Sequence, residues 1–243
     1  MSSLGGPRVH LREIDSTNER ARMLALAGAP HGTLVTADTQ TAGRGRQGRR
    51  WSAPANSSLL MSLVLRAPPS LLTLIAAVAV CDVVGSEARI KWPNDVVLPG
   101  SDPAQPLAKL AGILAEGQPQ AGWAVLGIGL NVAVRLEELP GELRSSAATL
   151  GYSPREIEPT LERLLAALER RLAEPATVTL EAWRLRDALH GREIAWGTRG
   201  PESWAGRGRA EGINDMGHLI VSLTDGGGQA ILDAGEVHLE RVG

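Results

Sequence analysis

The chain has 243 residues, of which 43% are hydrophobic and 21% charged, with a formal net charge of −2. This composition is that of a soluble globular protein with one large domain, or one large and one small. The near-neutral charge argues against general polyanion binding, which requires a basic excess. A single cysteine, Cys81, excludes an internal disulfide and fits a reducing cytoplasm.

The first elements in chain order are a helix and two strands. Ser16 and Glu19 form a capping box, which predicts a helix over residues 16–27. Apolar runs at 33–40 and 57–67 predict two strands, and a pair of prolines ends the second strand. The basic segment between these strands is considered below.

The segment 70–86 predicts a buried helix. Its apolar run of about 14 residues includes Asp82 and falls short of the roughly 20 residues that a membrane span needs. Cys81 lies in this run, so we expect a small buried hydrophobe and not a nucleophile. The N-terminus lacks the apolar core of a signal peptide, so we expect a cytoplasmic protein with no membrane partner.

Three further strands follow. One is expected over 88–98, interrupted at Pro93, and two more over 107–117 and 122–134. The sequence GQPQAG between the last two supplies a turn, so we expect them to pair as neighbours.

The C-terminal part changes character. After a polar region at 135–158, leucines at helical spacing predict a helix over 160–174, and a short helix is expected over 179–189. Beyond it, short alternating segments separated by glycine-rich turns suggest a small antiparallel barrel. We therefore expect two domains, residues 1–189 and 190–243.

The segment 39–51, TQTAGRGRQGRRW, has four arginines and three glycines within residues 43–50. Arginines offer planar forks for phosphate and carboxylate oxygens, and glycines let a backbone approach a ligand. Ordering such a loop costs on the order of 10 kcal/mol, which only a ligand with several oxygens or charges recovers. A solvated basic loop is the alternative, since GRGR recurs at 206–209 without these neighbours.

Five motifs in order carry a resemblance: STN (16–18), GRGRQGRRW (43–51), KWPNDV (91–96), KLAGILAE (109–116) and GIGLN (127–131). The set closely resembles the biotin protein ligases, also called biotin–[acetyl-CoA-carboxylase] ligases, from about residue 9 to the C-terminus. The resemblance implies an α+β fold, in which a mixed β-sheet backed by helices, like that of class II synthetases, precedes a small SH3-like β-barrel.

The resemblance also implies a two-step reaction with ATP, Mg²⁺ and biotin. The biotin carboxylate attacks the α-phosphorus of ATP, giving biotinyl-5′-AMP and pyrophosphate. A lysine of a biotin carboxyl carrier protein then takes the biotinyl group and releases AMP. The anionic transition state of the first step calls for fixed cations around the α-phosphate.

Site residues are carried over from the family position by position. Catalysis is assigned to Lys109, Arg46, Arg44 and Asp95. Biotin binding is assigned to Ser16, Thr17, Asn18, Gln40, Arg44, Gly45, Arg46, Lys109, Gly112, Gly127 and Gly129. ATP binding is assigned to Arg46, Arg49, Trp51, Asn94, Lys109 and Asn131, and no residue is assigned as a dedicated metal ligand.

Individual roles follow from the same resemblance. Residues 16–18 and Gln40 would bind the ureido head of biotin. Trp51 would stack on adenine, and Asn94 and Asn131 would contact the nucleotide and its Mg²⁺. Asp95 is a candidate base for the acceptor lysine, with a structural hydrogen-bonding role as the alternative. Arg50 is expected to face solvent.

This chain departs from the family pattern in places. Gln47 stands where some members have another arginine, and Ser52 replaces an aromatic residue, which leaves the adenine packing open. Ser16 comes too early for the N-terminal DNA-binding domain of some members, so we expect a monofunctional ligase that does not bind DNA. A homodimer through edge strands and a monomer are both compatible with the sequence.

Three other functions are less compatible with the sequence. A lipoate ligase or octanoyl transferase shares the catalytic fold, but the pairing of GRGRQGRRW with KWPND favours biotin. A nucleic-acid-binding protein would need further basic or aromatic patches. A catalytically inactive biotin sensor is disfavoured by the presence of Lys109 and all the loop arginines.

Overall fold

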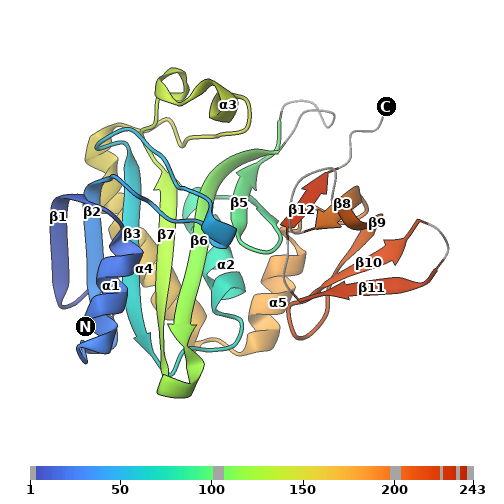
Figure 1. Ribbon diagram of the computed structural model, residues 1–243, viewed down its shortest axis with the longest axis horizontal. Helices are drawn as coiled ribbons and strands as arrows, with labels where there is room; N and C mark the ends of the chain where they lie inside the picture. Colours follow the sequence, from blue (N-terminus) through green and yellow to red (C-terminus); the bar gives the residue numbers. More distant parts are fainter. Residues whose placement is uncertain (1–3, 101–106, 198–203, 225–226, 234–235, 240–243) are drawn as a thin grey trace.

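The computed structural model describes residues 4–100, 107–197, 204–224, 227–233 and 236–239. These residues form a large sheet with helices on both faces, followed by a small sheet at the C-terminal end (Figure 1). The fold is therefore the α+β arrangement expected from the sequence, with a mixed sheet and an SH3-like barrel.

The large sheet has seven strands. In spatial order they are β1 (Arg8–Ile14), β2 (Leu34–Gln40), β3 (Ser58–Arg66), β7 (Trp123–Asn131), β6 (Ala108–Gln118), β5 (Asp95–Leu98) and β4 (Arg89–Lys91). Strands β1 and β2 pair in parallel and all other neighbours are antiparallel, so the sheet is mixed.

The helices divide between the two faces of this sheet. Helix α1 (Thr17–Leu26) packs against β2, β3 and β7 on one face, and α2 (Leu72–Val84) and α4 (Ile157–Ala173) cover the other (Figure 1). Helix α5 (Ala176–Arg184) packs against α2 and leads to the C-terminal sheet, and α3 (Gly141–Arg144) is a single turn. The 3₁₀ turns are η1 (Arg46–Gly48), η2 (Pro119–Ala121), η3 (Leu136–Glu138) and η4 (Pro154–Glu156).

Alternation along β7 explains why one face of the sheet is available for a ligand. Leu126, Ile128 and Leu130 are buried in the core shared with α2 and α4. Gly127 and Gly129 lie between them and therefore face the side of α1. With no side chains at these positions, the face opposite the core is left open above the middle of the sheet.

Several sequence predictions are confirmed, and others need correction. The two strands expected at 107–117 and 122–134 do pair, and Pro93 separates β4 from β5 in an antiparallel hairpin. Strand β1 was not predicted, because its half-exposed edge position lets charged residues occupy much of it. The helices expected at 160–174 and 179–189 both begin earlier, after η4 and after Pro175.

Cys81 has the buried position that the sequence indicated. Its side chain is fully shielded from solvent, and burial raises the pKa of the thiol to about 12. Among the described residues, no helix combines the length and the apolar character needed for a membrane crossing.

The C-terminal sheet has five antiparallel strands. In spatial order they are β11 (Gln229–Leu232), β10 (Leu219–Leu223), β9 (Trp204–Ile213), β8 (Glu193–Gly197) and β12 (Glu236–Leu239). The turn between β9 and β10 reaches back to the large domain, where Trp92 Nε1 donates to Gly217 O at 3.0 Å. Within the described residues, GRGR at 206–209 belongs to strand β9 and not to a loop.

Candidate functional site

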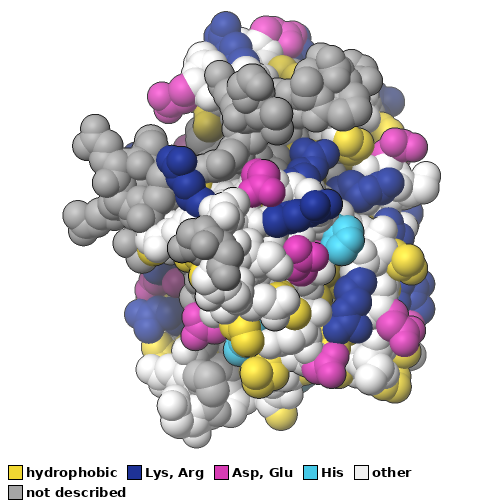
Figure 2. Space-filling view, turned by 90° about the vertical axis from the view of Figure 1, so that its right-hand side faces the viewer, with side chains coloured by type: hydrophobic (Ala, Val, Ile, Leu, Met, Phe, Trp, Pro, Cys, Tyr) yellow, Lys and Arg dark blue, Asp and Glu magenta, His cyan; other side chains and the backbone are white. Residues whose placement is uncertain are grey.

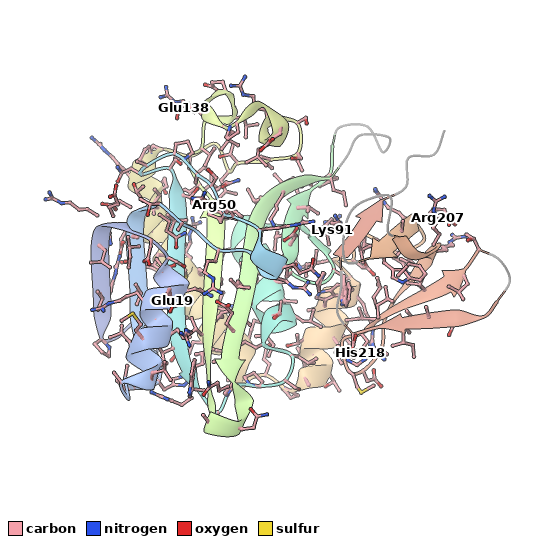
Figure 3. All side chains as sticks on the ribbon, in the orientation of Figure 1. Glu19, Arg50, Lys91, Glu138, Arg207 and His218 are labelled. Carbon is pink, nitrogen blue, oxygen red and sulfur yellow. The ribbon has the colours of Figure 1, made fainter. Side chains whose placement is uncertain are left out.

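A cavity lies on the face of the large sheet that carries α1. Its floor is formed by β6 and β7, one wall by the start of α1 and the end of β2, and its roof by the loop 43–51 (Figure 3). Fifteen of the residues predicted for the site line it: Ser16, Thr17, Asn18, Gln40, Arg44, Gly45, Arg46, Arg49, Trp51, Asn94, Asp95, Lys109, Gly112, Gly127 and Gly129.

The roof loop folds back on itself. Gly45 N donates to Arg49 O at 2.8 Å, and Trp51 N donates to Gly43 O at 3.0 Å. The return needs a left-handed backbone at Gln47, with φ of 54°, and at Gly48, with φ of 76°. The chain thus turns sharply at η1 and presents several arginines to one cavity.

Trp51 ends the roof loop, and its indole packs down onto the floor of the cavity. A Cβ atom on Gly129 would lie 2.6 Å from Trp51 Cε2, and one on Gly112 would lie 3.0 Å from Cζ3, so these glycines make room for the indole. Lys109 Nζ lies 5.7 Å from the centroid of the Trp51 ring, within the range of a cation–π contact. The indole of Trp51 is thereby packed between the strands of the floor and the Lys109 ammonium.

One end of the cavity is polar and uncharged. Gln40 Oε1 accepts from Thr17 N at 2.7 Å and from Thr17 Oγ1 at 3.0 Å. Ser62 Oγ lies 2.6 Å from Asn18 Oδ1 and 2.9 Å from Thr17 Oγ1. Ser16 caps α1 through a long bond from Glu19 N, is 3% exposed and also lines the cavity.

The other end is rich in cations. Lys109 Nζ forms an ion pair with Asp95 Oδ1 at 2.7 Å, and Arg46 Nη1 donates to Asn94 Oδ1 at 3.4 Å. Burial lowers the pKa of Arg46, although nearby Asp95 opposes this effect. Lys109 and Arg46 bring two positive charges close to one carboxylate, and the excess positive charge favours the arrival of an anion.

Lys91, on β4, extends this cationic region toward the barrel, as its position in Figure 3 shows. Burial lowers the pKa of the Lys91 ammonium, Asp95 opposes that shift, and Lys109 and Arg49 reinforce it. The sequence motif included Lys91 but gave it no role.

Arg44 and Arg50 differ in their partners. Arg44 Nη1 contacts Glu19 Oε2 at 2.9 Å and its Nη2 contacts Glu116 Oε1 at 2.8 Å. Arg50 Nη2 donates to Thr41 O at 2.6 Å, and its side chain is exposed, as expected, at the rim of the cavity.

The structure does not bring Asn131 to the cavity. Its Oδ1 accepts from Ser58 Oγ at 3.2 Å and its Nδ2 donates to Ala148 O at 2.9 Å, so both ends of this buried amide are used in the fold. Sequence reasoning missed Ser62 and Glu116, which contact the polar end. Ser62 had one signal, a hydroxyl in the middle of a run of apolar residues.

The arrangement suits a ligand with a neutral polar head and an anionic tail. The polar end offers oriented hydrogen-bond donors and acceptors, and the cationic end offers fixed positive charge at the far side of the same cavity. The fold and the cavity together define an α+β domain with a ligand-sized cavity on one face of its mixed sheet and a small barrel attached.

Comparison with known proteins identifies the family. Residues 11–132 match the model of the biotin/lipoate A/B protein ligase family. The chain is 35% identical over 240 residues to a biotin–[acetyl-CoA-carboxylase] ligase of Mycobacterium tuberculosis, covering 91% of this chain and 85% of that one. It is 34% identical to the ligase of the same name from Paracoccus denitrificans, covering 93% of this chain and 98% of the relative.

Other relatives are longer, and solved structures share the fold. The chain is 33% identical to the bifunctional ligase/repressor BirA of Bacillus spizizenii, covering 92% of this chain and 71% of that protein. The biotin protein ligase of Aquifex aeolicus, solved in complex with biotin and ATP, matches 98% of this chain and 100% of its own, with a TM-score of 0.76 and 25% identity. The chain belongs to the biotin/lipoate A/B protein ligase family.

Proposed function

We propose that this chain is an ATP-dependent biotin protein ligase, which activates biotin and transfers it to a lysine of a biotin carboxyl carrier protein. The observation that carries the proposal is a single cavity with a neutral polar end and a cationic end. It occurs in a chain 35% identical to a protein named biotin–[acetyl-CoA-carboxylase] ligase. Biotin has a matching shape, with a neutral ureido head and a carboxylate at the end of its tail.

In the first step, a biotin carboxylate oxygen bonds to the α-phosphorus of ATP and the bond to pyrophosphate breaks. Both reactants are anions, so uncompensated repulsion would keep them apart. Lys109, Arg46 and Arg49 line the cationic end of the cavity and would stabilise the charge that gathers on the α-phosphate. Trp51 would support the nucleotide from the floor.

In the second step, a carrier lysine amine attacks the biotinyl carbonyl, and AMP leaves with the bonding electron pair. The amine must first lose a proton, which costs roughly 4–5 kcal/mol at pH 7. Asp95 is the proposed base. While the acceptor is absent, the Asp95 carboxylate pairs with Lys109 and orders the cationic end. This ion pair must open before Asp95 can accept a proton from the acceptor lysine.

The residues present fit a Mg²⁺ ion that arrives with ATP. Among the described residues, no group of three or more His, Cys, Asp or Glu side chains could hold a metal ion alone. Mg²⁺ commonly binds through one or two protein oxygens together with substrate phosphates and water. Asp95 and Asn94 supply such oxygens at the cationic end, and the ion would shield phosphate charge there.

The rival within the family is a ligase for lipoate or octanoate. We would measure pyrophosphate release from ATP and Mg²⁺ with biotin, lipoate and octanoate tested separately and with no acceptor present. A burst of about one equivalent with biotin alone is expected, because the adenylate stays bound. Release only with lipoate or octanoate would reassign the substrate, and biotin binding without release would indicate a sensor.

The acceptor would be the carrier domain of acetyl-CoA carboxylase or a related biotin-dependent enzyme in the cytoplasm. Nucleic acid is a poor candidate for the barrel face, where side chains of both charges are interspersed over the visible surface (Figure 2). A homodimer is tested by sedimentation of the chain with and without biotin.

A further inference from the structure

Glu116, near the end of β6, joins two parts of the cavity that are far apart in the sequence. Its Oε1 accepts from Arg44 Nη2 in the roof loop at 2.8 Å, and its Oε2 accepts from Asn18 Nδ2 in α1 at 3.0 Å. The side chain is 27% exposed, so water screens these contacts less than at an open surface. One carboxylate is therefore shared between the roof and the polar end.

Glu116 also fixes which way the Asn18 amide points. A carboxylate only accepts hydrogen bonds, so the NH₂ group must face Glu116 and the oxygen must face elsewhere. Asn18 Oδ1 then lies 2.6 Å from Ser62 Oγ, which can donate to it. If the amide were turned over, Asn18 Oδ1 would face the Glu116 carboxylate, and two hydrogen-bond acceptors would be in contact. A Cβ on Gly127 would lie 1.9 Å from Oδ1, so that glycine admits the amide.

Arg44 divides its guanidinium between two carboxylates. Glu19 on α1 lies 2.9 Å from Nη1, and Glu116 on β6 lies 2.8 Å from Nη2 (Figure 3 labels Glu19 beside the loop). The loop is thereby anchored to both elements. Of these two carboxylates, only that of Glu116 forms a hydrogen bond with the polar end in the described part of the chain, because Glu19 contacts Ser16 through its backbone N–H alone.

We propose that Glu116 is a positioning residue that couples closure of the loop 43–51 to recognition of the neutral head of the acid substrate. The proposal rests on the function proposed above. A ureido head bound at the polar end holds Asn18 in one orientation, which places Glu116 to receive Arg44. Without that carboxylate, the head group meets an amide free to turn, and the loop loses one of its two anchors.

Glu116→Gln tests the proposal, because glutamine has nearly the same shape but one of its two ends is a donor. That end faces either Arg44 or Asn18, so the variant cannot accept from both. Glu19→Gln is the matched comparison, since it removes the charge of the other partner of Arg44 and leaves the hydrogen bonds of the polar end intact. Glu162→Gln, at an exposed position on α4, controls for the loss of a negative charge.

Two quantities are measured for each variant: the Kd of biotin without ATP, by calorimetry, and the rate at which biotinyl-AMP leaves the washed enzyme. For Glu116→Gln we expect about tenfold weaker biotin binding and about tenfold faster release, the scale of one lost charged hydrogen bond. Glu19→Gln should speed release alone. Glu162→Gln should match the wild-type chain in both.

Equal biotin affinity in Glu116→Gln and Glu19→Gln would overturn the coupling while leaving the ligase function intact. A fall in thermal stability with parallel rises in the KM for biotin and for ATP would make Glu116 merely structural, because a positioning role raises the KM for biotin alone. A wild-type chain that binds no biotin would overturn the proposed function and the coupling together.

Discussion

Lys109 is the proposed catalytic residue whose contacts are defined on two sides. It is held between Asp95 and the Trp51 ring, and its side chain is 40% exposed, so it contributes little to the core. Lys109→Ala should slow adenylate formation on the order of 10²- to 10³-fold, because a fixed charge is lost beside the reacting phosphate. Pyrophosphate release and thermal melting check this together, and a matching loss of stability would contradict it.

Gly129 supports Trp51 by lacking a side chain. In Gly129→Ala the new Cβ would lie 2.6 Å from the indole, which must move off the floor at a cost of about 1–3 kcal/mol. We expect a raised KM for ATP in adenylate formation. Gly141→Ala is the matched control, because no atom lies within 4 Å of its added Cβ. Equal kinetics in the two variants would show that Trp51 tolerates the shift.

At the scale of residues, the motifs predicted most of the cavity lining but not how its members contact one another. Ser62 lies in a strand whose apolar pattern indicated only burial, and the sequence does not show which hydroxyl faces α1. Asn131 occupies a motif position, yet the neighbouring segment offers Ala148 O to its amide. Such pairings depend on tertiary approach, which single-sequence patterns do not contain.

The loop 43–51 is the element whose behaviour should depend most on ligand. Trypsin should cut after its arginines in the free chain, and biotin with ATP should slow that cutting, because a bound anion holds the arginines in place. The second GRGR, at 206–209, is an internal control, since it lies in strand β9. Cleavage there should not respond to ligand, and equal protection of the loop in both states would refute ligand-dependent ordering.

Asp82 connects the end of α2 to two other segments. Its carboxylate contacts Arg171 at 2.7 Å, Arg170 at 2.8 Å and Arg186 at 3.3 Å, and its side chain is 13% exposed. Burial acts to raise the pKa of Asp82, but hydrogen bonds from Arg171 and Arg170 outweigh it and hold the pKa below its ordinary value. This carboxylate should therefore stabilise the fold in its ionised form.

Asp82→Asn should lower the free energy of unfolding by about 2 kcal/mol at pH 7, since three guanidinium groups lose their shared anion. A lowered folded-state pKa gives stability that is present above the unfolded-state value near 4 and is lost as the pH falls through the folded-state value. The difference between variant and wild type should thus shrink in acid. Urea unfolding at pH 7 and below pH 4 measures it, and a constant difference would contradict the assignment.

Element types were predictable where one apolar pattern dominates, as in β3, β7 and α2. Strand β1 was missed because it is an edge strand with charged residues along it, and its pairing with β2 is a long-range choice. Helix starts were misplaced where prolines and polar residues begin the helix before the apolar stripe does. An apolar pattern therefore predicts the presence of a helix or strand more reliably than its first residue.

At the scale of the whole molecule, the sequence indicated two units but not how they sit together. The segment that joins them is fixed on the large sheet, where Ile90 N donates to Arg186 O at 2.7 Å and Ala188 N donates to Ile90 O at 2.9 Å. The β9–β10 turn adds a second attachment through Gly217 and Trp92. These contacts place the barrel beside the cationic end of the cavity.

Gly217 offers a test of that second attachment. It has a φ of +78°, and a Cβ there would lie 2.6 Å from Leu74 Cδ1 and 3.0 Å from Leu71 Cδ2, both on the large domain. Gly228 has a φ of +99° in the barrel with no atom near its added Cβ, so Gly228→Ala matches the backbone strain without the clash. Each alanine should cost about 1–3 kcal/mol from strain.

Gly217→Ala should therefore lose more stability than Gly228→Ala, by about 1–3 kcal/mol for the added overpacking. Amide exchange should also quicken around Trp92 and the β9–β10 turn, because the two domains are pushed apart there. Adenylate formation should persist, since the cavity lining comes from the large domain alone. If both variants lose equal stability and show the same amide exchange, the turn accommodates the methyl group without loss. The barrel is then held on the large domain mainly by the segment after α5.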